Sequence, residues 1–571
     1  MFQPFVKNVK TNKLEIDSFS GLNKTNTIAD NEFSKLKNLS LREYPSVTPR
    51  KKRMETVMTL EPSGEIIPPA DIQKILQVKP NPGFITDGEL VIDDTIAAVA
   101  YHRLYYNGAL VQKDGDEEYE LEANDVICFN NMLYIFPDKL CCDLSDGEPV
   151  LKSMSDVFQA RSISFKSTES SSGFITNTVT RPSGTWDTLF KKGDSIVISG
   201  CTKQKNNTVK TSARINSSDT DDIVSVIVED VSDNEMKVSC YNALGACMKF
   251  DTGTSDRYTE SVQIKIEKYI PDMSHVCVHN NRLWGTSQDG KYIYASKLGD
   301  FSNFNSFSGI STDSWWALIA TDDEFTAITS YENHVVAFKK NYIYEVYGDK
   351  PSNFQIPYAV NGGCSDGNSI AQISGVLFFT DNGGVSVYNG AEPIEISQKI
   401  LPDKDIVCAA GVSFDKKYYL SAKSAGGEAM LYVYDTALKN WLMYDETDVK
   451  CFVKIEDMMF ALTDDALFLT ETELGDETVQ WECVTKDFSY CVDKKIVNKV
   501  CIDMEIEANS QAEIELCYDG RITLECCKIS GGLKRVHNIP IRIRRCDSFK
   551  IIIKGSGKFS LNKIQIVYTK K

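Results

Sequence analysis

The chain has 571 residues, of which 42% are hydrophobic and 25% charged, and its formal net charge at pH 7 is −18. This length allows several domains, and the composition is typical of a globular rather than a disordered chain. The acidic balance argues against a protein whose main surface grips nucleic acid, because that affinity comes from clustered Lys and Arg.

The cysteine content bears on the redox compartment and on metal binding. Seventeen cysteines are scattered through apolar segments, and their number is odd. This pattern predicts reduced, buried thiols made in a cytoplasm rather than a disulfide framework. No CxxC motif occurs, so no structural zinc site is expected. The first ten residues lack the pattern of a secretory leader, and no apolar run is long enough to cross a bilayer, so we expect no membrane span.

Residues 1–90 are expected to form an irregular N-terminal docking segment. Phe33, Leu36 and Leu39 are spaced by three, which predicts a short helix, with Asp30 or Asn31 as its N-cap. Prolines after this segment favour an extended path, since the residue before a proline is biased away from helix.

A basic run closes the extended path at Arg50, Lys51, Lys52 and Arg53. These four residues are the candidate docking patch, a surface that could bind an acidic neighbour. The alternative is an ordinary solvated patch of charge.

Strand patterns begin near residue 90, and residues 91–156 are expected to form the first one or two blades of a β-propeller. A Ser- and Thr-rich region with shorter strands follows at 157–270. Because strand repeats stand on both sides of it, we expect this region to be a small barrel-like β-domain inserted at an exposed turn.

A repeated unit of strand, turn and strand fills residues 271–472, the remaining blades. Tyr294, Tyr344, Tyr388 and Tyr434 mark its register, and a period of about 45 residues is that of a propeller blade. The pattern leaves a count of five, six or seven blades open.

The last region, 473–571, begins with an acidic linker and continues with alternating strands. Ile541 and Ile543 alternate with Arg542 and Arg544, as in a half-buried antiparallel strand. The predicted fold class is therefore all-β: a β-propeller interrupted by an inserted small β-domain and followed by a C-terminal β-sandwich.

Motifs that would carry chemistry are weak. There are five histidines, and neither a metalloprotease motif HExxH nor a nucleophile elbow GxSxG occurs. Asp313, Asp322 and Asp323 lie near two tryptophans and offer a glycosidase acid and base as an alternative. The sequence predicts no catalytic residue, no cofactor-binding residue, no metal ligand and no enzyme activity.

Six segments of the chain carry a resemblance to a known family: residues 30–40, 44–50, 192–201, 281–285, 293–305 and 346–354. Together they resemble the β-propeller virion proteins of tailed bacteriophages and prophages, and they are similar in organisation to the tail nozzle or tail tubular proteins of short-tailed phages. The resemblance covers the chain from about residue 18 to the end.

This resemblance implies a structural part of a phage tail, assembled in the host bacterial cytoplasm and located in the virion. It implies a homo-oligomer, commonly a sixfold ring, joined to a portal or adaptor ring and to other tail proteins. The DNA would pass through its channel during ejection without specific binding. A tail-associated receptor-binding or lectin-like propeller is the second hypothesis, and a polysaccharide-degrading tail enzyme is the third.

Overall fold

The structure is a computed structural model, and it describes residues 11–60, 63–80, 85–86, 88–115, 118–145, 147–209, 221–401, 406–489 and 494–570. Among these residues the structure is all-β, and helical geometry is confined to two 3-10 turns, η1 (Pro69–Asp71) and η2 (Gln204–Asn206). Two compact units divide the chain. One comprises Met1–Asp71, Lys79–Ile92 and Asn368–Lys571, and the other comprises Ile72–Val78 and Asp93–Gly367.

Seven sheets have the form of propeller blades, which confirms the predicted β-propeller. Seven is the highest of the blade counts that the sequence left open. In five of them four antiparallel strands follow one another. The four register tyrosines occupy equivalent places, because Tyr294, Tyr344, Tyr388 and Tyr434 lie on the third strands β29 (Tyr292–Ala295), β33 (Tyr342–Val346), β37 (Gly384–Tyr388) and β41 (Ala429–Asp435). The sequence period therefore corresponds to the blade repeat.

Four blade sheets belong to the second unit. The first consists of β7 (Ile72–Gln77), β10 (Ile96–Ala100), β11 (Arg103–Tyr106) and β12 (Ala109–Leu110), and the second of β13 (Gln112–Lys113), β14 (Asp125–Phe129), β15 (Met132–Phe136), β16 (Leu140–Asp143) and β17 (Val150–Ser153). The third adds β27 (Met273–His279), β28 (Arg282–Ser287) and β30 (Trp315–Leu318) to β29. The fourth adds β31 (Phe325–Tyr331), β32 (His334–Lys339) and β34 (Ala359–Asn361) to β33. Because β7 pairs with β10, the first of these sheets begins before the predicted boundary at residue 91.

The inserted β-domain lies in the same unit, within the predicted range 157–270. It has its own core around Trp186, Phe165 and Ile198. Its strands are β18 (Val157–Ala160), β19 (Ser164–Glu169), β20 (Ile175–Thr180), β21 (Ser195–Ser199), β22 (Ser225–Val231), β23 (Glu235–Tyr241), β24 (Cys247–Met248), β25 (Arg257–Thr259) and β26 (Ile264–Glu267).

The first unit contains the other three blade sheets. Two are regular: β35 (Asp366–Ile373), β36 (Val376–Asp381), β37 and β38 (Ile394–Glu395); and β39 (Ile406–Phe414), β40 (Lys417–Ser424), β41 and β42 (Asn440–Met443). The third is composite: β43 (Cys451–Ile455), β44 (Met458–Leu462) and β45 (Leu467–Thr472) take their fourth strand, β5 (Lys52–Leu60), from the N-terminal region. Strands β6 (Glu65–Ile67), β8 (Ile85–Thr86) and β9 (Glu89–Ile92) extend this sheet.

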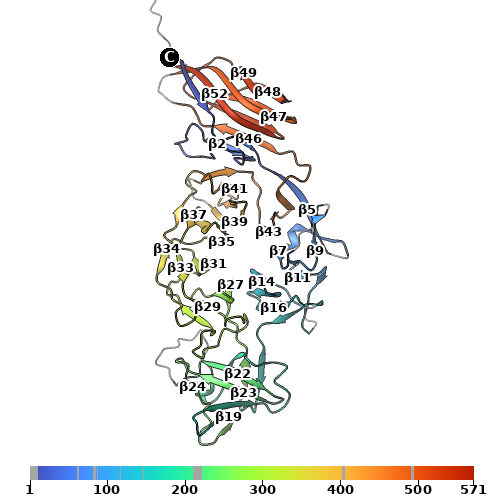
Figure 1. Cartoon of the computed structure of the whole chain (residues 1–571), viewed down its shortest axis with the longest axis vertical. Helices are drawn as coiled ribbons and strands as arrows, with labels where there is room; N and C mark the ends of the chain where they lie inside the picture. The colour runs from blue at the N-terminus through green and yellow to red at the C-terminus, as the bar shows by residue number, and fades with distance from the viewer. Residues whose placement is uncertain are drawn as a thin grey trace, which may run out of the picture. The chain divides into compact units, whose positions relative to one another are not determined.

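The C-terminal domain is built around one strand of 24 residues, β47 (Lys495–Tyr518), which Figure 1 labels beside β48, β49 and β52. The first half of β47 pairs with β52 (Phe559–Lys570), β49 (Val536–Ile539) and β50 (Arg545–Cys546). Its second half pairs with β51 (Phe549–Ser556) and β48 (Ile522–Gly532). Strands β46 (Gln480–Thr485), β1 (Thr11–Ile16) and β2 (Phe33–Lys37) complete the sheet.

Two predicted elements are wrong. No helix forms at residues 30–39, where the structure has β2 and β3 (Leu39–Ser40), the latter paired with β4 (Thr48–Pro49). The ladder of β2 with β46 shifts register between Phe33 and Lys35. This bulge inserts one residue, so Phe33 and Leu36 are both buried although a regular strand would place them on opposite faces.

The alternating strand predicted over Ile541–Arg544 also does not form. Strand β49 ends at Ile539, and β50 begins only at Arg545. Pro540 lies between them and has no backbone N–H to donate to a ladder. As a result Ile543 is 71% exposed.

Candidate functional site

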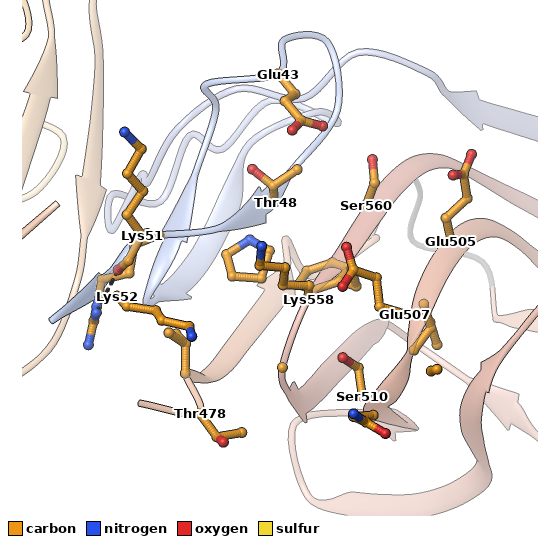
Figure 2. A pocket seen from close by; sticks show the side chains of 18 of the residues that line it. Glu43, Thr48, Lys51, Lys52, Thr478, Glu505, Glu507, Ser510, Lys558 and Ser560 are labelled. Carbon is orange, nitrogen blue, oxygen red and sulfur yellow. Dashed lines mark hydrogen bonds between the residues drawn. The ribbon is translucent and has the colours of Figure 1, made fainter. Parts of the chain in front are cut away.

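The candidate site is a cleft of about 860 Å³ in the first unit, hereafter the arm cleft. Three parts of the chain line it: the N-terminal arm (residues 42–52), the acidic linker (473–479) and the C-terminal domain. Figure 2 shows that side chains of both charges surround it, with Lys51 and Lys52 on the arm and Glu505 and Glu507 on β47. Pro49, Val479 and Phe559 contribute apolar lining.

Arg50 is the central residue of the arm, and its side chain is almost fully buried. Its Nη2 donates to Oε1 of Glu477 at 2.6 Å, its Nη1 donates to Oε2 of the same carboxylate at 3.0 Å, and its Nε donates to Asn38 Oδ1 at 2.8 Å. Burial would lower the pKa of Arg50, but the hydrogen bond and charge of Glu477 raise it overall. Such a bidentate pair fixes both position and orientation.

The pKa of Glu477 shows the same coupling from the acidic side. Burial would raise this pKa, yet the hydrogen bonds and charge of Arg50, with the backbone N–H of Arg53, lower it overall. The Arg53 N–H donates to Glu477 Oε2 at 2.6 Å. The carboxylate therefore stays ionised where the arm meets the linker.

Arg53 and Lys52 are also engaged within the chain. Arg53 Nη1 donates to Asp445 Oδ2 at 2.8 Å, and the Lys52 ammonium donates to the Gly475 carbonyl at 2.8 Å. Burial would raise the pKa of Asp445, but the charge and hydrogen bond of Arg53, the hydrogen bond of Thr447 and the charge of Arg50 together lower it.

The predicted docking patch, Arg50, Lys51, Lys52 and Arg53, is therefore corrected in one respect. Arg50 is unavailable to a partner because acidic groups of the same chain already surround its guanidinium. Docking through Lys51, Lys52 and Arg53 stays a prediction, and Lys51 and Lys52 line the arm cleft. The sequence indicated that the acidic segment is a linker between domains, but it gave no sign that this linker or Asp445 pairs with the basic run. No local pattern relates either of them to residue 50.

A second contact anchors the start of the arm. Arg42 Nη2 donates to Glu471 Oε2 at 2.7 Å. Glu471 has a φ of 54°, a left-handed value that side chains other than glycine rarely adopt. It lies where the ladder between β45 and β5 shifts register, so the bulge turns its carboxylate toward the arm.

Two of the three acidic residues that sequence analysis considered as a glycosidase acid and base, Asp313 and Asp323, hold hydrogen bonds within the fold. In the second unit, Asp313 accepts from the hydroxyls of Ser306 and Ser308 and from three backbone N–H groups at residues 308–310. This carboxylate is 4% exposed and organises its own loop. Asp323 accepts from the Asn341 amide at 2.9 Å.

Within the described ranges no three His, Cys, Asp or Glu side chains gather as metal ligands would. No helix in that part of the chain is long and apolar enough to cross a membrane.

Comparison with known proteins gives distant likenesses only. No protein-family model matches the sequence, and no curated protein matches it. Among solved structures, an exo-beta-1,3-galactanase from Phanerochaete chrysosporium is 7% identical, with a TM-score of 0.21, over 51% of this chain and 95% of that one. The WD40 domain of SCAP from fission yeast is 9% identical, with a TM-score of 0.28, over 74% of this chain and 95% of that one. The N-terminal domain of Nup159 is 10% identical, with a TM-score of 0.23, over 51% and 91%. At these scores the likenesses carry no functional information for this chain.

Proposed function

We propose that this protein is a structural component of a phage tail, a nozzle-like ring that extends the DNA channel below the portal or adaptor and takes part in genome retention and delivery. The proposal starts from the sequence resemblance to propeller virion proteins. The β-propeller with an inserted domain and a C-terminal domain is compatible with that family's organisation. On this proposal the protein is located in the virion and is not an enzyme.

The observation that carries the proposal is the way in which the first unit is fastened together. One hydrophobic core joins Phe19 and Phe33 of the N-terminal region, Tyr419 and Trp441 of a blade, and Ile502 of the C-terminal domain. The ion pairs of Arg42, Arg50 and Arg53 lie alongside this core. Such a frame keeps surfaces in fixed positions, which suits a part that transmits force between neighbours more than one that opens and closes.

The charge of the chain supports the DNA-channel role. With a formal net charge of −18, an acidic channel wall would repel the phosphate backbone and let DNA pass without binding it. The portal or adaptor ring and other tail proteins would be its protein partners.

Electron microscopy of the purified protein tests this proposal. Negative-stain images of the protein alone, and of the protein mixed with portal complex, are expected to show closed rings that cap the portal. Monomers that bind cell-wall glycan instead would favour the receptor-binding hypothesis. Release of reducing ends from cell-wall polysaccharide by the purified protein would overturn the non-enzyme part of the proposal.

A further inference from the structure

A short stretch of the C-terminal domain reverses the charge of the chain. Residues 533–545, hereafter the basic edge, contain no Asp or Glu, although the whole chain has a formal net charge of −18. The stretch carries five cations: Lys534, Arg535, Arg542, Arg544 and Arg545. All five are exposed. A basic strip on an acidic protein is complementary in charge to the acidic surface of other copies of the same chain.

The basic edge follows one side of β47, because its two short strands, β49 and β50, both pair with that strand. It runs antiparallel to β47, with Val536 opposite Asp503, Ile539 opposite Val500 and Arg545 opposite Ile496. In the part of the chain that the structure describes, β49 and β50 pair with β47 alone. One side of this strip is therefore a sheet edge.

Aliphatic side chains interrupt the cations. Leu533 is 105% exposed, Ile543 is 71% exposed and Val536 is 50% exposed. Charge and proline usually protect a sheet edge from aggregation, and this strip has both, in its five cations and Pro540. That protection does not require the three exposed aliphatic residues, and each of them gains free energy when a partner covers it.

Among the described residues, one of the five cations forms an ion pair with carboxylates of the same chain. Arg535 Nε lies 2.9 Å from Glu505 Oε1 and 3.5 Å from Asp503 Oδ1. Lys534, Arg542, Arg544 and Arg545 take part in no ion pair among the described residues. Arginine is enriched at protein interfaces, where its planar guanidinium pairs with carboxylates.

We propose that the basic edge is a contact surface between copies of this chain, and that it docks on an acidic surface of a second copy. The inference rests on the proposed ring and names the surface that joins its members. The same face cannot be its own partner, because like charges would meet, so the edge contacts a different surface of the second copy. In the proposed ring this contact is head to tail. A heterologous contact of this kind closes into a ring when its rotation allows.

The mixture of arginine and aliphatic residues favours a protein partner over nucleic acid. Phosphate contacts need cations alone and gain nothing from Leu533 or Ile543. An acidic protein surface uses both, since it pairs with the guanidinium groups and covers the aliphatic side chains.

Two double variants and one control test the inference. Arg542→Glu/Arg544→Glu reverses the charge of the edge, and Leu533→Ser/Ile543→Ser removes aliphatic contacts. Lys350→Glu/Lys454→Glu makes the same charge change at exposed lysines on two blades. Sedimentation velocity over a concentration series at low and high salt measures self-association, and circular dichroism checks that each variant is folded.

We expect each edge variant to associate at least roughly tenfold more weakly than the wild type. The control should associate as the wild type does. Salt should weaken assembly of the wild type and of Leu533→Ser/Ile543→Ser, and should weaken Arg542→Glu/Arg544→Glu less. Unchanged rings in both folded edge variants would overturn the inference and leave the proposed function standing. A wild type that stays monomeric would overturn the ring and the inference together. Binding of a labelled DNA duplex that Arg542→Glu/Arg544→Glu abolishes would show that the edge binds nucleic acid instead.

Discussion

At the scale of single residues, Arg50 fixes the N-terminal arm. Arg50→Ala removes four side-chain hydrogen bonds, two of them to Glu477, and leaves this half-buried carboxylate beside the backbone N–H of Arg53. Breaking a buried pair by removing one partner is costly, so we expect the free energy of unfolding to fall by about 3 kcal/mol. Urea denaturation measures this change. Lys51→Ala, at a neighbouring side chain without such a pair among the described residues, is the control and should change stability by less than about 0.5 kcal/mol.

Two adjacent glycines at the end of β48 give a matched test of its packing against β47. A Cβ at Gly531 would lie 1.9 Å from the Glu507 carbonyl oxygen, whereas a Cβ at Gly532 would meet nothing within 4 Å. Gly531→Ala should therefore destabilise the protein by about 1 to 3 kcal/mol through overpacking. Gly532→Ala should be neutral or slightly stabilising. Equal melting temperatures for the two variants would contradict the close approach of β48 and β47.

Two buried histidines predict a dependence of stability on pH. His279 Nδ1 lies 2.8 Å from Ser330 Oγ, and His334 Nε2 lies 3.3 Å from Glu345 Oε1. Burial lowers the pKa of both imidazoles below 6.5, and for His334 the charge of Glu345 offsets this only in part.

Both imidazoles bind protons more readily in the unfolded chain than in the folded one. The contribution of these two neutral imidazoles to the free energy of unfolding is therefore complete above pH 6.5 and is lost as pH falls toward their folded pKa values. Thermal melts at pH 7.5 and 5.5 should show a lower melting temperature at pH 5.5. This difference should shrink in His279→Asn and in His334→Gln. An unchanged difference in both variants would exclude these two residues as its source.

At the scale of elements, the composite blade is the feature that local pattern could not predict. Strand β5 pairs with β45, so Glu55 lies opposite Phe468 although more than four hundred residues separate them in sequence. The basic run at residues 50–53 was visible in the sequence, but its partners lie at 445 and 477. Charge patterning within a window indicates that a group needs a partner and does not indicate which partner it has.

Hydrogen exchange tests this pairing. The amides of β5 that pair with β45 should be protected to about the same degree as those of β44, because both strands open only when the blade opens. Arg50→Ala should raise exchange in β5 before it raises exchange in β44, since the ion pair anchors the entry to β5. Rapid exchange in wild-type β5 would contradict the composite blade.

At the scale of the whole molecule, the repeated blade strands and the inserted domain between them were predictable, whereas local irregularities and contacts distant in sequence were not. The four register tyrosines mark equivalent strands because every blade needs the same alternation of buried and exposed positions. Phe33 and Leu36 of β2 misled prediction because a bulge gave a strand the spacing of a helix. The candidate site is formed by contacts between residues far apart in sequence. The sequence therefore indicated its basic residues but not that Arg50 is buried.

The cysteines give the last prediction, and it concerns the whole chain. The described cysteines are reduced thiols, and Cys247 and Cys408 are the exposed ones among them. Burial raises the pKa of Cys240 and Cys483 far above the usual thiol range, and both side chains are buried, so these groups are both inaccessible and protonated at neutral pH. Maleimide labelling of the native protein at pH 7.5, read by mass spectrometry, should therefore modify Cys247 and Cys408 first. The two buried thiols should react only after denaturation, without a reducing agent. A requirement for reductant would show that disulfides form, and early labelling of Cys240 or Cys483 would show that the sheets around them open readily in the native protein.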